Sequence, residues 1–472
     1  MAESTFFWHD YETFGINPQR DFPAQFAGVR TDYNFKVVDK PITVYCKPSA
    51  DCLPQPDACV ITGITPQLAT EKGVCEAEFI RLIQQQLSQS NTCSLGYNTL
   101  RFDDEVTRNA LYRNFYDPYQ REWQNGNSRW DLIDVVRATR ALRPDGIVWV
   151  DNEAENRPSF KLTDLTQANG ISHEAAHDAL SDVYATISLA KLVKKKQPKL
   201  FDFLFENRQK DKAFELLQLG SFKPVVHVSG KYPARKNCLA VVLPICKHPT
   251  NANEVVVYDL SIDPQPLLEL TADEIKQRLF IATELLPEGV ERIALKTIHI
   301  NKCPVIIPFA KNTVEHLEID LELCKENLAK IKTAKNLETK LASVFSSPHY
   351  EPITDPDLMI YSGGFFGNQD KAAMLKIRNT PVAELANLKP KFVDKRLQEM
   401  FFRYKARNYP HILTAEEQKH WQAFCYTRIN DQKEAYLNRI NELKQQPDID
   451  FTLLAALEAY LSDKLALLTH CN

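Results

Sequence analysis

Two carboxylates stand two residues apart near the start of the chain, in Phe6-Phe-Trp-His-Asp10-Tyr-Glu12-Thr13. The apolar run before them predicts a buried strand, and side chains two residues apart on a strand point to the same face. Neighbouring carboxylates repel each other, so folding alone does not favour this pair, whereas a divalent cation between them removes the repulsion. Oxygen ligands suit Mg²⁺ or Mn²⁺ better than zinc. Taken alone, the motif is also compatible with a solvated strand end.

Two later segments add further ligand candidates. Asp103 follows an aromatic residue where a loop is expected to pass into a helix, and by itself it could equally be a helix N-cap. His177 and Asp182 are five residues apart, so they share a helix face only if His177 lies at or before the start of the helix. Asp178 is then a rival ligand, because a spacing of four to Asp182 fits a helix face better. A single His near a helix start is more often a capping or surface residue than a catalyst.

The composition of the chain limits the class of protein to which it can belong. The chain has 472 residues, of which 44% are hydrophobic and 25% charged, so it is globular and long enough for about three domains. A net charge of -4 excludes a uniformly basic nucleic-acid coat but allows a local basic groove. Eleven Cys with no CxxC pair predict reduced thiols in a cytoplasmic protein, not a disulfide framework or a cysteine zinc site. No signal peptide or membrane-spanning run is expected.

Periodicity divides the chain into three regions. Up to residue 198, strand-like and helix-like stretches alternate, which predicts a mixed α/β sheet. The expected strands are 5–8, 24–30, 39–45 and 93–97, and the expected helices are 76–88, 104–114, 132–142 and 173–196. After a helix at 201–219, short β-branched runs at 224–229, 239–243 and 255–258 predict a small β-barrel with helices near 271–280 and 313–344. A Pro-rich linker near 346–356 precedes a helical region. We therefore expect domains at 1–198, 199–350 and 351–472.

The ordered set of acidic residues resembles the DEDDh exonuclease superfamily, whose pattern is D-x-E, then Phe-Asp, then H-x4-D. The matching residues are Asp10, Glu12, Asp103, His177 and Asp182. Relatives that use Tyr place it four residues before the last Asp, where this chain has Asp178, so the His subclass fits. Segments such as Tyr112–Tyr119, Lys223–Gly230 and Phe392–Arg396 resemble the bacterial exodeoxyribonuclease I family over nearly the whole chain. The resemblance implies a ribonuclease H-like nuclease domain, an SH3-like domain and a C-terminal all-α domain.

The resemblance also implies an activity: removal of 5'-mononucleotides from the 3' end of single-stranded DNA, in DNA repair and recombination. Two Mg²⁺ ions would bind the attacking and leaving oxygens, and Mn²⁺ can substitute. Asp10 would bridge both ions, while Glu12 and Asp182 hold the ion that binds water. Asp103 would support the second ion, and His177 would be the general base, because histidine titrates near neutral pH.

Several residues are expected to contact the substrate. Glu12 would also meet the terminal 3'-OH, with Thr13 beside it. Lys161 stands where the family has an Arg on the substrate phosphate, so the charge is kept but the bidentate fork is lost. Cations for phosphates and aromatic faces for bases are typical of single-strand binding. The further candidates are Arg108, Tyr119, Trp123, Arg137, His299, Lys302, Tyr361 and Phe366.

A second candidate surface is the stretch 371–407, which has ten Lys/Arg and three Asp/Glu. The alternative interpretation, without a binding function, is a solvated basic face. The resemblance implies a second partner, the acidic C-terminal tail of single-stranded DNA-binding protein, which this stretch could bind. Three domains that close on one strand need no second subunit, so a monomer is expected.

Two other functions remain open at this point. An RNA-trimming exoribonuclease of the same superfamily would share the five site residues, although it would have no reason to share the downstream segments. A non-catalytic single-stranded DNA-binding clamp would have no reason to keep five intact catalytic residues. A zinc-binding regulator is not supported by the Cys and His spacings.

Overall fold

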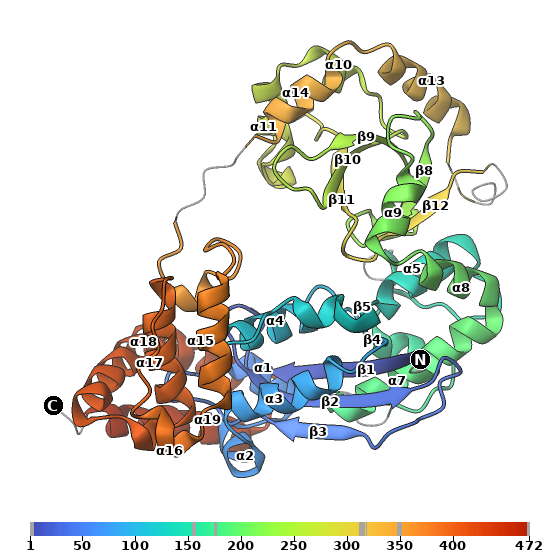
Figure 1. The fold of residues 1–472 in the computed structure, drawn as a ribbon. Coiled ribbons are helices and arrows are strands. Elements are labelled where there is room, and N and C mark those ends of the chain that lie inside the picture. The colour runs from blue at the N-terminus through green and yellow to red at the C-terminus, as the bar shows by residue number, and fades with distance from the viewer. Residues whose placement is uncertain are drawn as a thin grey trace. The chain divides into compact units, whose positions relative to one another are not determined.

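The computed structural model describes residues 4–152, 157–173, 177–310, 317, 319–346 and 352–469. The chain divides into two compact units (Figure 1). The first, here called the sheet unit, comprises Met1–Ser128, His173–Ile187 and Pro352–Asn472. The second, the barrel unit, comprises Arg129–Ser172 and Ser188–Glu351. The expected boundaries at 198 and 350 stay a prediction.

The first sheet has the strand order β3-β2-β1-β4-β5. Its strands are β1 (Thr5–Thr13), β2 (Pro23–Thr31), β3 (Ile42–Tyr45), β4 (Thr92–Leu95) and β5 (Ser128–Arg129). β1 lies at the centre, antiparallel to β2 and parallel to β4. Because both faces of β1 are covered, Phe6, Phe7 and Trp8 are all buried, which explains a continuous apolar run instead of an alternating one. The mixed sheet expected from the sequence is confirmed.

Helices surround this sheet within the same unit. The N-terminal ones are α1 (Pro56–Thr62), α2 (Pro66–Lys72), α3 (Glu76–Leu87) and α4 (Asp103–Arg113), with short 3₁₀ turns η1 (Gln120–Glu122) and η2 (Gln124–Gly126). α7 (Ala179–Lys196) begins in the sheet unit and ends in the barrel unit. The expected helix at 173–196 is therefore too long at its start. His177 has a positive φ of 68°, which places a turn there and delays the helix to Ala179.

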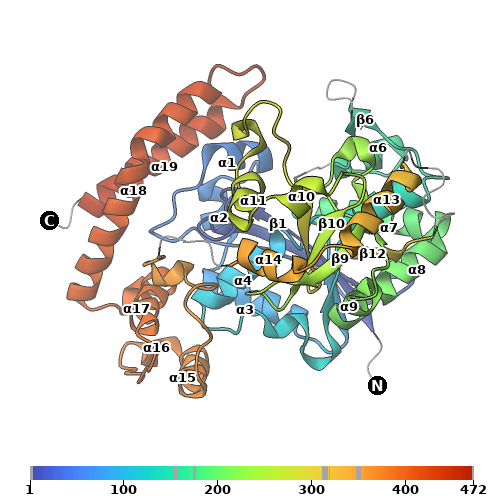
Figure 2. The same cartoon turned by 90° about the horizontal axis from the view of Figure 1, so that it is seen from above.

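The C-terminal part of the sheet unit is helical, as expected. Its elements are η6 (Pro356–Leu358), α15 (Asn368–Asn379), α16 (Val382–Leu385), α17 (Arg396–Asn408), η7 (Pro410–Ile412), α18 (Ala415–Leu443) and α19 (Phe451–Thr469). The long helices α18 and α19 lie side by side (Figure 2). A capping box between Thr414 and Glu417 fixes the start of α18. Apolar residues of α18 and α19 share one core with Phe14, Phe22 and Ala24 near the N-terminus.

The barrel unit contains a five-stranded antiparallel sheet with the order β11-β10-β9-β8-β12. The strands are β8 (Val225–Val228), β9 (Leu239–Lys247), β10 (Glu254–Asp259), β11 (Leu295–His299) and β12 (Val305–Pro308), with a separate pair β6 (Asp151–Asn152) and β7 (Arg157–Pro158). Buried β-branched residues such as Val242, Val255 and Val257 form its core. The three runs expected to be strands are all strands.

The helices of the barrel unit include two that the sequence pattern merged. The stretch expected as one helix at 201–219 forms two, α8 (Pro198–Glu206) and α9 (Lys210–Leu217), because the chain turns at Asn207. The others are α5 (Leu132–Leu142), α6 (Leu162–Ala168), η4 (Ala234–Lys236), α10 (Gln265–Glu269), α11 (Ala272–Leu279), η5 (Thr283–Leu285), α13 (Leu321–Lys332) and α14 (Leu337–Val344). Much of the expected linker at 346–356 lies outside the described residues.

A buried ion network joins distant parts of the sheet unit. The Arg407 guanidinium on α17 donates to both Asp51 and Asp357, at 2.9 Å and 2.6 Å, and all three side chains are at most 5% exposed. The neighbouring cation keeps the pKa values of both carboxyl groups below their usual range, although burial alone would raise them. These ion pairs connect the loop after β3, the segment before α15 and helix α17.

We predict that Arg407→Leu destabilises the protein by about 3–5 kcal/mol near pH 7, because two buried carboxylates lose their partner. Both folded pKa values lie below the unfolded value, so the stabilisation is present above the ordinary Asp pKa and is lost as pH falls through the folded values. The difference in the free energy of unfolding between the variant and the wild type should therefore become smaller below about pH 4. Urea unfolding at pH 7 and pH 3.5 measures this. Arg81→Leu, which removes a half-exposed pair with Glu78, is the control and should change little. A variant as stable as wild type at pH 7 would contradict the prediction.

Candidate active site

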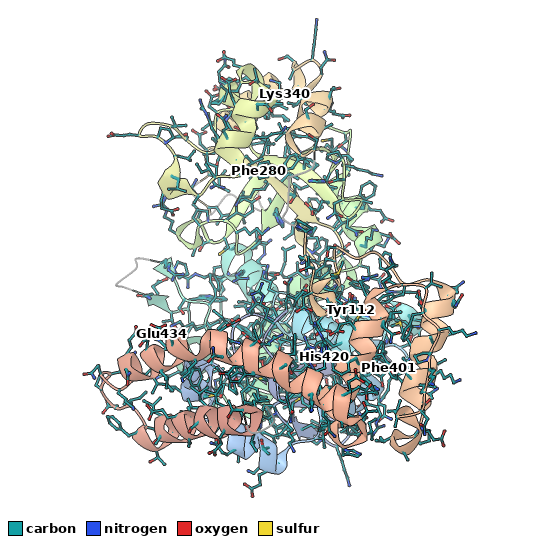
Figure 3. All side chains as sticks on the ribbon, turned by 90° about the vertical axis from the view of Figure 1, so that its left-hand side faces the viewer. Tyr112, Phe280, Lys340, Phe401, His420 and Glu434 are labelled. Carbon is teal, nitrogen blue, oxygen red and sulfur yellow. The ribbon has the colours of Figure 1, made fainter. Side chains whose placement is uncertain are left out.

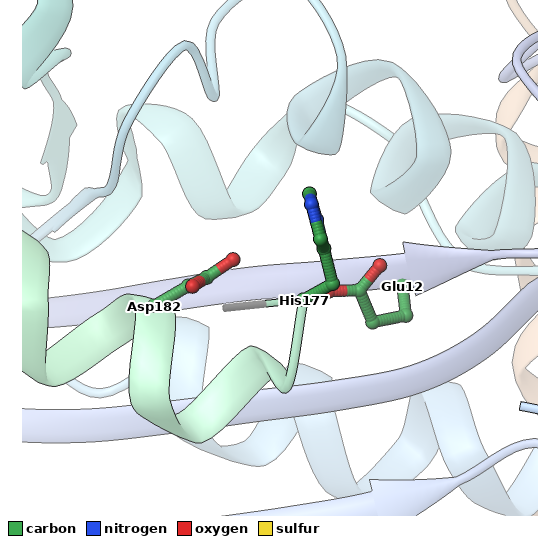
Figure 4. Close-up of side chains that lie close together, drawn as sticks. All are labelled: Glu12, His177 and Asp182. Atoms are coloured by element: carbon green, nitrogen blue, oxygen red, sulfur yellow. The ribbon is translucent and has the colours of Figure 1, made fainter. Parts of the chain in front are cut away.

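The predicted acidic cluster assembles in the sheet unit from three segments. Asp10 and Glu12 come from β1, and Asp103 is the first residue of α4. Asp182 lies in the first turn of α7, and His177 lies in the turn before that helix. Ligand atoms of Glu12, His177 and Asp182 all lie within 4.8 Å of one another (Figure 4). A spacing of five residues works here because His177 precedes the helix.

Asp103 is tied directly to the strand that carries the other carboxylates. Its Oδ1 accepts a hydrogen bond from the backbone N–H of Tyr11 at 3.0 Å, between Asp10 and Glu12 in sequence. The Tyr11 hydroxyl accepts a second bond from Thr107, one turn further along α4. Phe102, not Asp103, is the N-cap of α4. The alternative interpretation of Asp103 as a helix cap is therefore wrong.

Asp178, the rival ligand, has another role. Its Oδ2 accepts a hydrogen bond from the Ser181 backbone N–H, as a residue that caps the start of α7 does. Its other oxygen accepts from the Gln25 side chain at 3.4 Å. Asp178 is absent from the group of mutually close ligand atoms, as are Asp10 and Asp103, whereas Asp182 belongs to it. The hydrogen bonds of Asp178 give it a structural role, and Asp182 stays the predicted ligand.

Burial and, after it, charge repulsion set the electrostatics of the cluster. Burial, together with Asp103, Glu12, Asp182 and Asp178, raises the pKa of Asp10 well above its usual range. Burial and neighbouring carboxylates also raise the pKa of Glu12 to about 8. The folded protein therefore holds protons on these groups that a bound cation would displace. Oxygen ligands that repel one another in this way, with one imidazole beside them, fit a divalent metal site.

A buried Arg fixes the helix start that carries Asp103. Arg121, whose side chain is fully buried, donates to Asp104 at 2.6 Å and to the Ser94 hydroxyl on β4 at 3.2 Å. Asp104 is the neighbour of Asp103, so this ion pair fixes the first turn of α4 against the sheet. His9 adds no positive charge here, because burial lowers its pKa to about 4.

Sequence reasoning missed two residues near the cluster. His173 forms a hydrogen bond from Nε2 to Asp182 Oδ1, and its side chain is almost fully buried. A histidine on a ligating carboxylate orients that carboxylate. The acidic motif alone could not select His173, because its spacing to Asp182 is not part of the pattern. Arg121 was missed because nothing in its local sequence indicates that it is buried.

The predicted DNA-contact residues of the sheet unit form an aromatic group. Tyr119 contacts Tyr361, with ring centroids 6.5 Å apart. Arg108 is buried, forms ion pairs with Glu105 and Glu122, and lies over the Tyr119 ring. Its charge is thus neutralised within the protein, and it supports the aromatic residues. Trp123 is 67% exposed, so its interpretation as a core residue is wrong.

Two adjacent phenylalanines differ in exposure. Phe366 stacks on Tyr112 and packs under Arg396, so it belongs to the core of the helical region. Phe365 is 86% exposed and contacts the Tyr119 ring edge-on at 6.0 Å. Phe365 is a further candidate that the sequence did not single out, because a pair of phenylalanines does not show which one is buried.

The other predicted contact residues lie in the barrel unit. Lys161 is exposed at the N-cap of α6, and Arg137 pairs with Asp134 on α5 at 2.9 Å. His299 ends β11, where its Nδ1 lies 3.4 Å from Glu254, and Lys302 lies in the turn after it. Thr13, in the sheet unit, is buried at the end of β1 and its hydroxyl donates to the Gly15 carbonyl.

The stretch 371–407 is not a continuous basic surface. Four of its ten cations are buried and paired with carboxylates inside the sheet unit: Arg396 with Asp394, Arg403 with Asp355 and Asp357, Lys405 with Glu417, and Arg407 with Asp51 and Asp357. Figure 3 labels Phe401, in the same helix, among these packed side chains. Arg403, Lys405 and Arg407 pair with acidic residues outside the stretch, whereas Arg396 pairs with Asp394 inside it.

Comparisons with known proteins agree with this arrangement. Three family models match: Exonuclease over residues 7–190, Exonuclease I SH3-like domain over 208–347 and Exonuclease I C-terminal domain over 354–464. The Exodeoxyribonuclease I of Escherichia coli is 47% identical over 466 residues, which cover 97% of each chain. The chain belongs to the exodeoxyribonuclease I family. It is an exonuclease, and its predicted fold class, with a nuclease, an SH3-like and a C-terminal helical domain, is confirmed.

Two solved structures of this family carry ligands that bear on the site. The zinc-bound form of the E. coli ExoI–ssDNA complex has a TM-score of 0.94 and 45% identity, and the match covers 98% of this chain and 100% of that one. An SSB/Exonuclease I structure with an inhibitor has a TM-score of 0.90 and 43% identity, with the same coverage. Exonuclease domains of this family are metal-dependent, in keeping with the acidic cluster. Among the described residues, no helix is both long enough and apolar enough to cross a lipid bilayer.

We predict that divalent-cation binding releases protons at pH 7, because the pKa of Glu12 is about 8 in the metal-free protein and that of Asp10 is raised as well. Their raised folded pKa values make folding less favourable once pH exceeds the unfolded values, and the cation reverses this effect. Affinity for Mn²⁺ should therefore rise with pH and level off above about pH 8. Calorimetric titration in buffers of different ionisation enthalpy counts the protons. The Glu12→Gln variant should release fewer protons on Mn²⁺ binding. Identical binding heats in all buffers would contradict the prediction, because they would show that the carboxylates are already ionised.

Proposed function

We propose that this protein is a metal-dependent 3'-to-5' exonuclease that degrades single-stranded DNA to 5'-mononucleotides. The observation that carries the proposal is the convergence of Glu12, His177 and Asp182, with Asp10 and Asp103 held beside them. The family membership and the relative's complex with single-stranded DNA support the substrate. A role in DNA repair and recombination follows from the same membership.

The protein's residues have distinct tasks in this reaction. Two Mg²⁺ ions, for which Mn²⁺ can substitute, would lower the pKa of the attacking water and stabilise the charge on the phosphate. Asp10 would bridge the two ions, Glu12 and Asp182 would hold one, and Asp103 would support the other. His173 keeps one oxygen of Asp182 in place.

His177 accepts the proton from the attacking water. It is exposed, and its ring lies against the carboxylates of Glu12 and Asp182. The left-handed turn at His177 is what presents the ring ahead of the helix. Glu12 would also contact the terminal 3'-OH beside Thr13, which accounts for attack at a strand end.

The DNA strand would continue over exposed aromatic rings. In the sheet unit these are Trp123, Tyr361 and Phe365, with Tyr119 beside them. In the barrel unit Lys161, Arg137, His299 and Lys302 would contact phosphates. Lys161 would meet the phosphate as a single charge and not as the two-pronged Arg of the family.

Partner binding is part of the proposal. The acidic C-terminal tail of single-stranded DNA-binding protein would dock on this chain, and the SSB/Exonuclease I structure supports that protein as a partner. The internal pairing of Arg396, Arg403, Lys405 and Arg407 argues against these four cations as the docking residues. We propose that the protein acts as a monomer in the cytoplasm.

We predict that His177→Ala lowers turnover by about 10²- to 10⁴-fold, because the attacking water loses its base. Asp10→Asn should abolish metal-dependent cleavage. The assay follows 5'-labelled single-stranded DNA and a sequence-matched RNA with Mg²⁺, and DNA binding is measured separately in EDTA. Both variants should bind DNA like wild type, and wild type should spare the RNA.

The matched control is His411→Ala, which removes an exposed histidine from η7 in the same unit. It should cleave normally. Near-normal turnover in His177→Ala would refute the role of His177. Preferential digestion of the RNA would favour the exoribonuclease alternative, and no cleavage of either strand would favour the non-catalytic clamp.

We predict that Trp123→Ala weakens single-stranded DNA binding by about 1–3 kcal/mol, because one base loses its stacking surface. Binding should weaken as salt is added, since phosphate neutralisation releases counterions, but the slope of log affinity against log salt should not change in this variant. Fluorescence anisotropy in EDTA at several salt concentrations measures both. Phe451→Ala, which removes a similarly exposed aromatic ring from α19, is the control. An unchanged affinity for Trp123→Ala would remove Trp123 from the DNA path.

A further inference from the structure

A cavity of about 520 Å³ in the barrel unit is not used by the proposed reaction. It lies beside β9, β10 and β11, and the residues after α11 and α14 contribute to its wall. Its volume is within the range of small-molecule binding pockets, roughly 300–1,000 Å³. It shares no residue with the acidic cluster or with the predicted DNA-contact residues.

The polar lining of the cavity is strongly positive. Four cationic side chains line it, those of Lys231, Lys236, Arg292 and Lys296, against one carboxylate, that of Asp259. In the part of the barrel unit that the structure describes, none of these four cations forms an ion pair within 4 Å of a carboxylate. This differs from the stretch 371–407, where four buried cations are paired with carboxylates. The cavity therefore has unmatched positive charge, which fits an anion with more than one negative charge.

Lys296 lies partly buried in this cavity. Its Nζ donates to the Lys231 carbonyl at 2.6 Å and lies 3.6 Å from the centroid of the Tyr232 ring. Burial lowers the pKa of Lys296 to about 8, with Asp259 opposing the shift and Lys231 and Arg292 adding to it. The Tyr232 hydroxyl is buried and has no hydrogen-bond partner among the described residues. An anionic oxygen in this cavity would stabilise the charged ammonium group.

The apolar part of the lining includes an exposed aromatic face. Phe280, which follows α11, is 62% exposed, and its ring packs edge-on against Phe345 with centroids 5.9 Å apart. Figure 3 labels Phe280 in this unit. Contact with Phe345 holds the Phe280 ring while one face stays open, as a surface on which a flat ring can stack requires.

We propose that this cavity binds a 5'-mononucleotide, with its phosphate at Lys296, Arg292 and Lys231 and its base against Phe280. Phosphate alone would leave the exposed aromatic face unused, and an uncharged aromatic molecule would leave the cations unpaired. The choice of a deoxynucleotide rests on the proposed function, because that reaction releases this class of molecule. The site would then hold a product of the enzyme in a different unit from the cluster that forms it.

Calorimetric titration with dTMP in EDTA tests the proposal, with thymidine and inorganic phosphate as comparison ligands. EDTA removes cations through which a nucleotide could bind at the acidic cluster. Wild type and Asp10→Asn should bind one dTMP with the same affinity, and thymidine and phosphate should each bind at least about tenfold more weakly. Phe280→Ala and Lys296→Gln should each weaken dTMP binding by about tenfold or more. Lys325→Gln, at an exposed position of α13 outside the cavity, is the matched control and should bind normally.

A second readout follows from the protonation of Lys296. Because the bound phosphate favours the charged ammonium group, dTMP binding should take up protons near pH 8 and weaken as pH rises from 7.5 to 9.5. Lys296→Gln should lose this pH dependence. Phe280→Ala should keep it, since the base and not the phosphate loses its contact.

Three results would overturn the proposal: no dTMP binding to wild type, equal binding of phosphate alone, or full dTMP affinity in Phe280→Ala. Loss of binding in Asp10→Asn would also overturn it, because the nucleotide would then occupy the acidic cluster. If Lys296→Gln fails to fold, Phe280→Ala still decides, since its side chain is exposed. A protein that binds dTMP here but digests no DNA would refute the proposed function and leave this site standing.

Discussion

Repulsion among buried carboxylates is the constraint on which the sheet unit depends. Asp10, Glu12, Asp103 and Asp182 occupy a space where burial and mutual repulsion already raise the pKa values of Asp10 and Glu12. A chain free to relax would separate them. They stay together because three rigid elements fix them: the central strand β1, which carries Asp10 and Glu12, the start of α4 and the first turn of α7. The fold supplies the free energy that keeps the cluster together until a cation binds.

A layer of neutral and cationic partners around the cluster makes this possible. The Tyr11 backbone holds Asp103, Arg121 neutralises Asp104, and His173 binds one oxygen of Asp182. Arg121 does not cancel the charge of the cluster itself, since it is paired with Asp104. The arrangement orients the ligands and leaves their negative charge available for a divalent metal.

Short spacings predicted four of the five site residues: two residues on a strand, and five across a helix start. Asp103 came from the Phe-Asp element of the family pattern. The sequence did not predict what surrounds these residues. His173 was placed in a helix whose start the left-handed turn at His177 moves to Ala179. The positive stretch 371–407 suggested a surface, because Asp51 and Asp357, which neutralise Arg407, lie elsewhere in the chain. Charge read along a sequence does not show which cations already have partners.

The cations of this protein fall into two kinds, those paired with carboxylates and those without a carboxylate partner. Arg403 and Arg407 are paired with buried carboxylates, and their removal should act on stability. Lys296 and Arg292 instead donate to backbone carbonyls, which satisfy their hydrogen bonds but leave their charge unmatched. A carbonyl dipole orients a cation without neutralising it, so such a site still attracts an anion. Unmatched charge around a cavity, and not the local density of Lys and Arg, therefore indicates where this chain can bind a phosphate.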